Sequence, residues 1–238
     1  MVLDKIYTGV INLVLFFSII FFRKIVHKEG IKSFLFHFDK KGRKFFWKGF
    51  FSGFLFFIIY CIITVITKQG KVHVFYGGIK ETLVIILSGL FAYLSVSLLE
   101  ESFFRGYVLE KLSNVFPTNI AAIISSVFFG LFHIQAYSTS KTIFIGIINA
   151  ALIGIILSTV VIKTKSIMLP LGYHLSWNLI QSILFNNYKY NVKGLIALEI
   201  KENIWTGYSI IPESGLIITS VCIIMLIYFR FRLRDYSN

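Results

Sequence analysis

Seven long apolar stretches dominate this sequence of 238 residues. Each is close to the roughly 20 residues that a helix needs to cross a hydrocarbon core about 30 Å thick. Unpaired backbone groups are costly in lipid, and the stretches are apolar at both odd and even positions, so helices are expected and barrel strands are not. The sequence therefore predicts an all-α fold, a polytopic transmembrane helix bundle of about seven or eight spans. We place the seven at Ile6–Phe22, Gly49–Thr67, Thr82–Leu99, Thr118–Tyr137, Thr142–Ile162, Ile167–Phe185 and Gly215–Phe229.

The connections between these stretches are short. The two longest, Arg23–Lys48 and Asn186–Ser214, each hold fewer than thirty residues. With 56% hydrophobic and only 15% charged residues, the chain leaves no room for a soluble domain of useful size. We expect a single membrane domain over residues 1–238, with a core at 82–185 that carries the polar motifs described below.

The net charge of +13 follows the expected membrane topology and does not indicate nucleic acid. With the N-terminus outside, sixteen of the 24 Lys and Arg fall in inside segments, nine of them in Arg23–Lys48, and eight, Lys5 among them, fall outside. Positive residues are enriched in cytoplasmic loops and are attracted to anionic lipids. We therefore expect a multi-pass protein of the cell membrane with its N-terminus outside and its C-terminus cytoplasmic. Membrane lipids are expected partners and nucleic acid is not.

Four ionisable side chains within or beside the apolar stretches need an explanation. They are Glu100, Glu101, His133 and His174. Even on permissive insertion scales, an ionisable group at membrane depth costs about 2.5–3.5 kcal/mol, so each is a candidate functional residue. All three aspartates lie outside the stretches, which makes this set specific.

The two glutamates are expected on one continuous helix, because nothing before Gly106 breaks the helical run that the third stretch begins. Glu101 and Arg105 are four residues apart, so they share a helix face and can pair. Glu100 points about 100° away around the helix. The arginine can thus neutralise one carboxylate while the other serves as a general base.

Two further polar groups come from later stretches. His174 and Asn178 are four residues apart, so the amide can orient the imidazole or donate to a developing oxyanion. His133 lies deep in the fourth stretch. Convergence of these groups from three apolar helices predicts a catalytic site made of Glu100, Glu101, Arg105, His133, His174 and Asn178.

Two chemistries fit this set. Glu100, His133 and His174 could bind Zn²⁺ and leave a fourth position for water. The same groups could work without a metal, with Glu100 activating water and the histidines and Asn178 stabilising the oxyanion. The residues alone do not decide between them.

What the sequence lacks excludes a His-Glu-x-x-His metalloprotease and a paired-aspartate protease, and disfavours serine chemistry. It has no His-Glu-x-x-His motif, no aspartate in any stretch and no Gly-x-Ser-x-Gly motif. Cys61 and Cys222 each lie in the middle of an apolar stretch, where they are expected to fill space rather than form a disulfide or a metal site.

The three motifs Glu100-Glu101-x-x-x-Arg105, Phe129-x-x-x-His133 and His174-x-x-x-Asn178, in that order, resemble those of the CAAX-protease and bacteriocin-processing (Abi, CPBP) family. This family includes the type II CAAX prenyl endopeptidases. The resemblance implies an intramembrane endopeptidase whose catalytic set is these glutamates, histidines and asparagine, with the arginine as pairing partner. It implies cleavage near the C-terminus of prenylated proteins in eukaryotes, and peptide maturation or bacteriocin self-immunity in bacteria.

The short chain, with no targeting segment, looks like a bacterial member, so a small secreted or membrane-associated peptide is the expected substrate. Two other functions stay open. A catalytically silent scaffold or regulator of a membrane partner would have the same fold. A transporter could use buried Glu and His to relay protons, although no internal pseudo-symmetry supports it.

Overall fold

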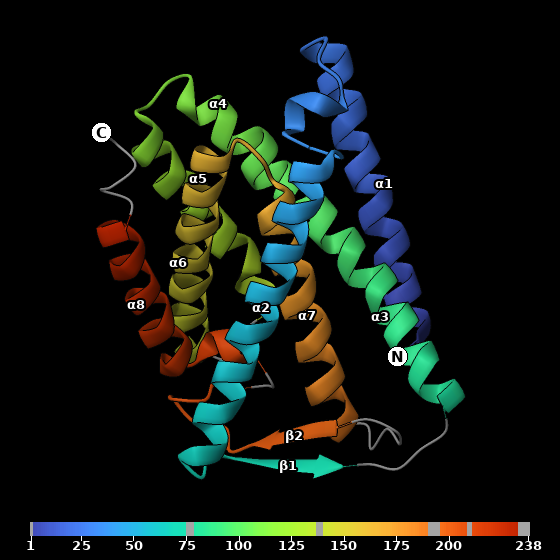
Figure 1. The fold of residues 1–238 in the computed structure, drawn as a ribbon, viewed down its shortest axis with the longest axis vertical. Coiled ribbons are helices and arrows are strands. Elements are labelled where there is room, and N and C mark those ends of the chain that lie inside the picture. The colour runs from blue at the N-terminus through green and yellow to red at the C-terminus, as the bar shows by residue number, and fades with distance from the viewer. Residues whose placement is uncertain (1, 75–78, 137–139, 190–195, 209–210, 233–238) are drawn as a thin grey trace. The chain divides into compact units, whose positions relative to one another are not determined.

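The computed structural model describes residues 2–74, 79–136, 140–189, 196–208 and 211–232 (Figure 1). It confirms the all-α prediction. The helices are α1 (Val2–Val26), α2 (Lys40–Ile66), α3 (Ile79–Glu100), α4 (Leu109–Ser113), α5 (Thr118–Phe132), α6 (Ser140–Thr164), α7 (Met168–Lys189) and α8 (Leu216–Arg232). A π-helix, η2 (Glu101–Val108), joins α3 to α4, and short 3₁₀ turns lie at Ile31–Phe34, His133–Ala136 and Pro212–Ser214. Two strands that the sequence analysis did not anticipate, β1 (Gly70–Val74) and β2 (Ile196–Ile200), pair with each other.

Five helical segments among the described residues are long and apolar enough to cross a membrane. Each coincides with one of the predicted stretches. Helix α7 forms where the sixth stretch was predicted, but it carries polar side chains and is not among the five. In α8 the apolar part, Leu216–Ile227, is shorter than a full span. The five segments are Val2–Val26, Lys40–Ile66, Thr82–Ser113, Thr118–Ala136 and Thr142–Thr164.

The basic connection predicted between the first two spans is largely helical. Helix α2 begins at Lys40, nine residues before the predicted boundary at Gly49, because Asp39 caps it by accepting a hydrogen bond from the Gly42 amide at 2.7 Å. At the other end of this connection, Arg23 belongs to α1 and its side chain is buried. The charge of Arg23, which the sequence pattern assigned to membrane topology, thus lies inside the protein.

Lys5 is a second basic residue with a buried side chain. It was assigned to a segment outside the membrane, but α1 already begins at Val2, and Lys5 is buried with its ammonium 5.9 Å from the centre of the Tyr93 ring of α3. A cation over an aromatic face is attracted by the ring quadrupole, which compensates in part for lost hydration. The orientation of the termini stays a prediction.

The chain divides into two compact units, residues 1–108 with 160–199, and residues 109–159 with 200–238. In the first unit, α1 packs on α3, and α7 packs on both α2 and α3 (Figure 1). The prediction of a single membrane domain stays a prediction.

Glycines allow α2 and α7 to approach backbone to backbone. A Cβ atom on Gly49 would collide with the carbonyl oxygen of Leu169, and one on Gly172 would collide with that of Phe46. Gly49 and Gly53 form a small-xxx-small pattern, which is common where membrane helices pack closely. This contact fixes how α7 is rotated, and so where it presents its polar residues.

The second unit is held together by a buried amide. Asn149 of α6 is fully buried, and its Nδ2 donates to the carbonyl oxygens of Glu213, at 2.7 Å, and Gly215, at 3.0 Å. These carbonyls lie immediately before α8, so the amide ties the start of that helix to α6.

Replacing Asn149 by Leu, which has a similar volume, should therefore destabilise the protein by about 2 kcal/mol, because two buried carbonyls lose their donor. The measurement is the thermal melting of purified protein in detergent. Asn12→Leu is the matched control, since the Asn12 amide donates to Thr8 of its own helix on an exposed face. Equal melting temperatures for the two variants would contradict the expected role.

Candidate active site

The first part of the site is a buried ion pair on the π-helix. Arg105 Nη1 lies 3.1 Å from Glu101 Oε1, and both side chains are buried. The pairing expected from their spacing is thus present. The backbone differs from the expected α-helix, because π-helical turns run through Glu101–Val108. Such turns in otherwise α-helical segments are frequently found at functional sites.

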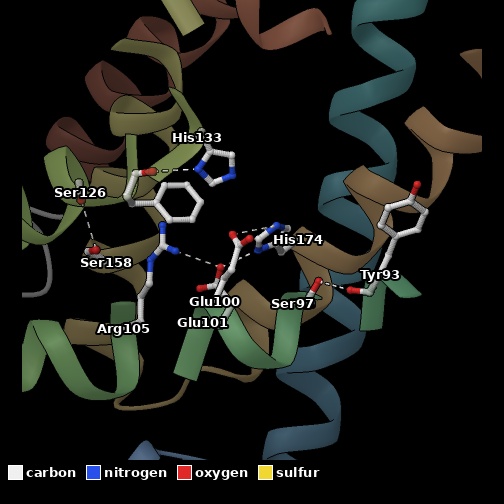
Figure 2. A network of polar contacts seen from close by, with 10 residues as sticks. Tyr93, Ser97, Glu100, Glu101, Arg105, Ser126, His133, Ser158 and His174 are labelled. Atoms are coloured by element: carbon white, nitrogen blue, oxygen red, sulfur yellow. Dashed lines mark hydrogen bonds and ion pairs between the residues drawn. The ribbon is translucent and has the colours of Figure 1, made fainter. Parts of the chain in front are cut away.

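Helix α7 adds a histidine to this pair. His174 Nδ1 lies 2.8 Å from Glu101 Oε1, the same oxygen that Arg105 contacts (Figure 2). A carboxylate oxygen accepts hydrogen bonds, so Nδ1 carries the hydrogen. Glu101 therefore fixes both the orientation and the tautomer of the imidazole, which directs Nε2 to the other side of the ring.

The second glutamate faces that other side. Glu100 Oε2 lies 3.8 Å from His174 Nε2, and both residues are about nine-tenths buried. This separation is longer than a direct hydrogen bond but suits two groups that share a bridging water or a reacting atom. The imidazole thus lies between two carboxylates, hydrogen-bonded to Glu101 on one side of its ring and facing Glu100 on the other.

Arg105 compensates the charge of one of the two carboxylates, because it pairs with Glu101 at 3.1 Å. In a low-dielectric interior such pairing is required, since an isolated charge is very costly. The other carboxylate, Glu100, faces the imidazole of His174, and a carboxylate beside an imidazole suits general acid–base chemistry.

Asn178 lies one turn further along α7 and is half-buried. Its i,i+4 relation to His174 places the two side chains on one helix face, as expected. Aromatic packing holds this helix in place, since Trp177 lies 5.1 Å from Phe57 of α2 and stacks on Tyr173.

His133 lies near the end of the helical segment Thr118–Ala136, where the fourth stretch was predicted. Helix α5 ends at Phe132, and His133 opens the 3₁₀ turn that continues it. Its Nδ1 lies 2.8 Å from the carbonyl oxygen of Phe129, one turn earlier, and the centres of the two rings are 4.5 Å apart. His133 belongs to the second unit, whereas the other five candidates belong to the first. Its participation in the site stays a prediction.

The donor atoms of the first unit fit zinc poorly. His174 Nδ1 bonds to Glu101, which leaves His174 Nε2 and Glu100 Oε2 as a possible pair of ligand atoms. Catalytic zinc sites use three protein ligands. Within the part of the chain that the structure describes, no three His, Cys, Asp or Glu side chains are grouped to hold a metal ion.

Sequence reasoning missed the residue that contacts the far end of the π-helix. Arg23 Nη1 donates to the carbonyl oxygen of Gly106 at 2.9 Å. No local pattern could have indicated this contact, because the two residues are 83 positions apart and a basic residue after an apolar stretch looks like a topology signal.

Comparison with known proteins found one family that part of the chain resembles. Residues 82–180 match the family described as type II CAAX prenyl endopeptidase Rce1-like. This region is Rce1-like. The resemblance predicted from the three motifs is thereby confirmed for this region, which is under half of the chain but contains all six candidate residues. Neither the curated proteins nor the solved structures gave a match.

The Rce1-like match supports a CAAX-type intramembrane protease, and the five apolar helices support a multi-pass membrane protein. Peptide or protein substrates and membrane lipids are the corresponding partners. The roles of individual residues, the chemistry and the substrate are taken up below.

Proposed function

We propose that this chain is an intramembrane endopeptidase in which Glu100 activates the attacking water. One observation carries the proposal, namely the placement of His174 between two buried carboxylates, with Nδ1 on Glu101 and Nε2 facing Glu100. A buried carboxylate that faces an oriented imidazole is an arrangement suited to proton transfer.

In the proposed reaction, Glu100 takes a proton from a water molecule near His174 Nε2. The resulting hydroxide attacks the carbonyl carbon of the scissile peptide bond, and the carbonyl oxygen becomes an oxyanion. Glu100 then returns the proton to the nitrogen of the leaving amine as the C–N bond breaks. Atoms and charge balance without a further reagent, because water adds across the bond.

The remaining residues prepare the site for this reaction. Arg105 pairs with Glu101 and holds its carboxylate in place, and Glu101 orients His174. His174, with Asn178, would donate to the oxyanion. Preorganised donors of this kind contribute strongly in a site that excludes bulk water. No step passes through a metal, since the donor set of the described residues does not favour one.

The proposed substrate is a small membrane-associated or secreted peptide, as in bacteriocin-type maturation or self-immunity in a bacterial cell membrane. The short connections between spans support a membrane-associated substrate, since a site buried among helices is reached by chain that lies in or on the membrane, and the Rce1-like match supports a peptidase. The rival function is a silent scaffold, which would use the same fold without hydrolysis.

The test is cleavage of quenched fluorescent peptides by purified protein in detergent. The panel holds unprenylated amphipathic peptides and a farnesylated peptide ending in a CAAX sequence. We expect wild-type protein to cleave unprenylated peptides and Glu100→Gln to lower kcat by about 10²–10⁴-fold, the range of general base catalysis. The matched control is Glu110→Gln, a half-buried glutamate of α4 that pairs with Lys111. A zinc chelator should leave the rate unchanged.

Each outcome has a distinct meaning. Loss of cleavage with chelator alone would replace glutamate-activated water by metal chemistry. Cleavage of the farnesylated peptide alone would overturn the substrate but keep the peptidase. If no peptide is cleaved and Glu100→Gln still supports the cellular phenotype of the wild type, the scaffold function takes its place.

A further inference from the structure

We propose that Arg23 of α1 is a positioning residue that holds the end of the π-helix η2, and through it the ion pair of Glu101 and Arg105. This inference rests on the proposed peptidase function. It makes the first helix part of the catalytic core, although the Rce1-like match begins only at residue 82.

The buried guanidinium of Arg23, near the end of α1, makes both hydrogen bonds and aromatic contacts. Its side chain is buried, its Nη1 donates to the carbonyl oxygen of Gly106 at 2.9 Å, and its Nε donates to Glu29 Oε2 at 2.7 Å. The guanidinium also lies over two aromatic rings, 4.7 Å from the centre of Phe34 and 5.7 Å from that of Tyr107. Such planar stacking combined with forked donation is specific to arginine.

The acceptor of this hydrogen bond is next to a site residue. Gly106 directly follows Arg105 within η2. The wider turn of a π-helix depends on neighbouring groups more than an α-helix does, since it is rare and usually limited to a single turn. A charged donor on the Gly106 carbonyl stabilises the backbone at the point where the direction of the Arg105 side chain is set.

Close packing on the same segment supports the role. A Cβ atom on Gly106 would lie 3.0 Å from Phe34 Cδ1, so the absence of a side chain lets the ring approach the π-helix. Next to it, the Tyr107 hydroxyl lies 3.1 Å from His27 Nε2, which adds a second polar contact between the end of α1 and η2. These contacts lie on one segment, residues 106–107, rather than along the whole length of α1.

Glu29 explains why a buried guanidinium is tolerated here. It forms an ion pair with Arg23, so the charge is compensated beside the π-helix. A glutamine at position 23 would lose the charge that strengthens the bond to Gly106, the ion pair with Glu29 and the stacking on the aromatic rings. A lysine would keep the charge but not the fork and the stacking.

The experiment compares Arg23→Gln, Arg23→Lys and the matched control Lys24→Gln, which removes the same charge from the neighbouring exposed residue. One readout is kcat and KM on the quenched peptide that the wild type cleaves. The other is amide hydrogen exchange over residues 101–108. We expect Arg23→Gln to lower kcat about 10²-fold at an unchanged KM, as small misplacements of catalytic groups do, and to speed exchange at 101–108 while α2 and α7 stay protected. Arg23→Lys should be intermediate and Lys24→Gln unchanged.

The proposal fails if Arg23→Gln leaves both kcat and exchange at 101–108 equal to those of Lys24→Gln. It also fails if exchange rises equally in every helix, because that result describes a general loss of stability. Amide hydrogen exchange can be measured whether or not the protein is active. If the wild type cleaves no peptide, the peptidase function is refuted, but exchange at 101–108 still tests whether Arg23 positions η2.

Discussion

Glu101→Gln should destabilise the protein as well as inactivate it, whereas Glu100→Gln should inactivate it at nearly unchanged stability. The difference follows from the partners of the two carboxylates. Glu101 compensates the buried charge of Arg105 at 3.1 Å, while Glu100 approaches His174 at a looser 3.8 Å. Removing one member of a buried ion pair costs about 3–5 kcal/mol, because the remaining charge is left without compensation.

A double variant separates the two effects of Glu101. In Glu101→Gln with Arg105→Gln, the unbalanced charge is gone, so we expect most of the lost melting temperature to return. Activity should not return, because a neutral amide no longer fixes the imidazole of His174 as a carboxylate does. Melting in detergent and cleavage of the quenched peptide are measured on the same samples. A double variant as unstable as the single one would show that the ion pair does not account for the stability of this cluster.

Gly172→Leu should prevent α7 from seating on α2 and should cost about 3 kcal/mol or more. The new side chain would meet backbone atoms of Phe46 and Phe50, and backbone cannot move aside unless the helices separate. Because His174 is two residues further along α7, the site would be lost with the contact. The yield of monodisperse protein on size exclusion and its melting temperature are the measurements.

The control for this variant is Gly30→Ala, since a Cβ atom at Gly30 would meet nothing within 4 Å. We expect Gly30→Ala to match the wild type in yield and melting temperature. If Gly172→Leu also matched the wild type, the close approach of α2 and α7 would not be what positions His174.

Features governed by spacing along one helix could be predicted from the sequence. The apolar stretches predicted the helices, and the four-residue interval predicted the ion pair of Glu101 and Arg105. Pairing between segments could not be predicted, because it depends on how helices are rotated against one another. Glu101, rather than Glu100, bonds to His174, and nothing in either motif distinguishes the two carboxylates.

Two further differences have local causes that hydropathy does not register. The start of α2 is set by the Asp39 cap, which acts among charged residues that look like a loop. The burial of Arg23 and Lys5 depends on aromatic rings supplied by other segments. Hydropathy assigns both residues to water, because it scores each residue without its partners. The role of His133 stays a prediction.

The π-helix also has a consequence for the length of the membrane segment that contains it. A π-helix turns less and rises less per residue than an α-helix, so η2 places more residues in the same thickness of bilayer. The apolar run of α3 can therefore match the hydrocarbon thickness while η2 directs Arg105 with a different helical phase. A membrane helix that needed a single phase throughout would have to compromise between contact with lipid and the direction of Arg105.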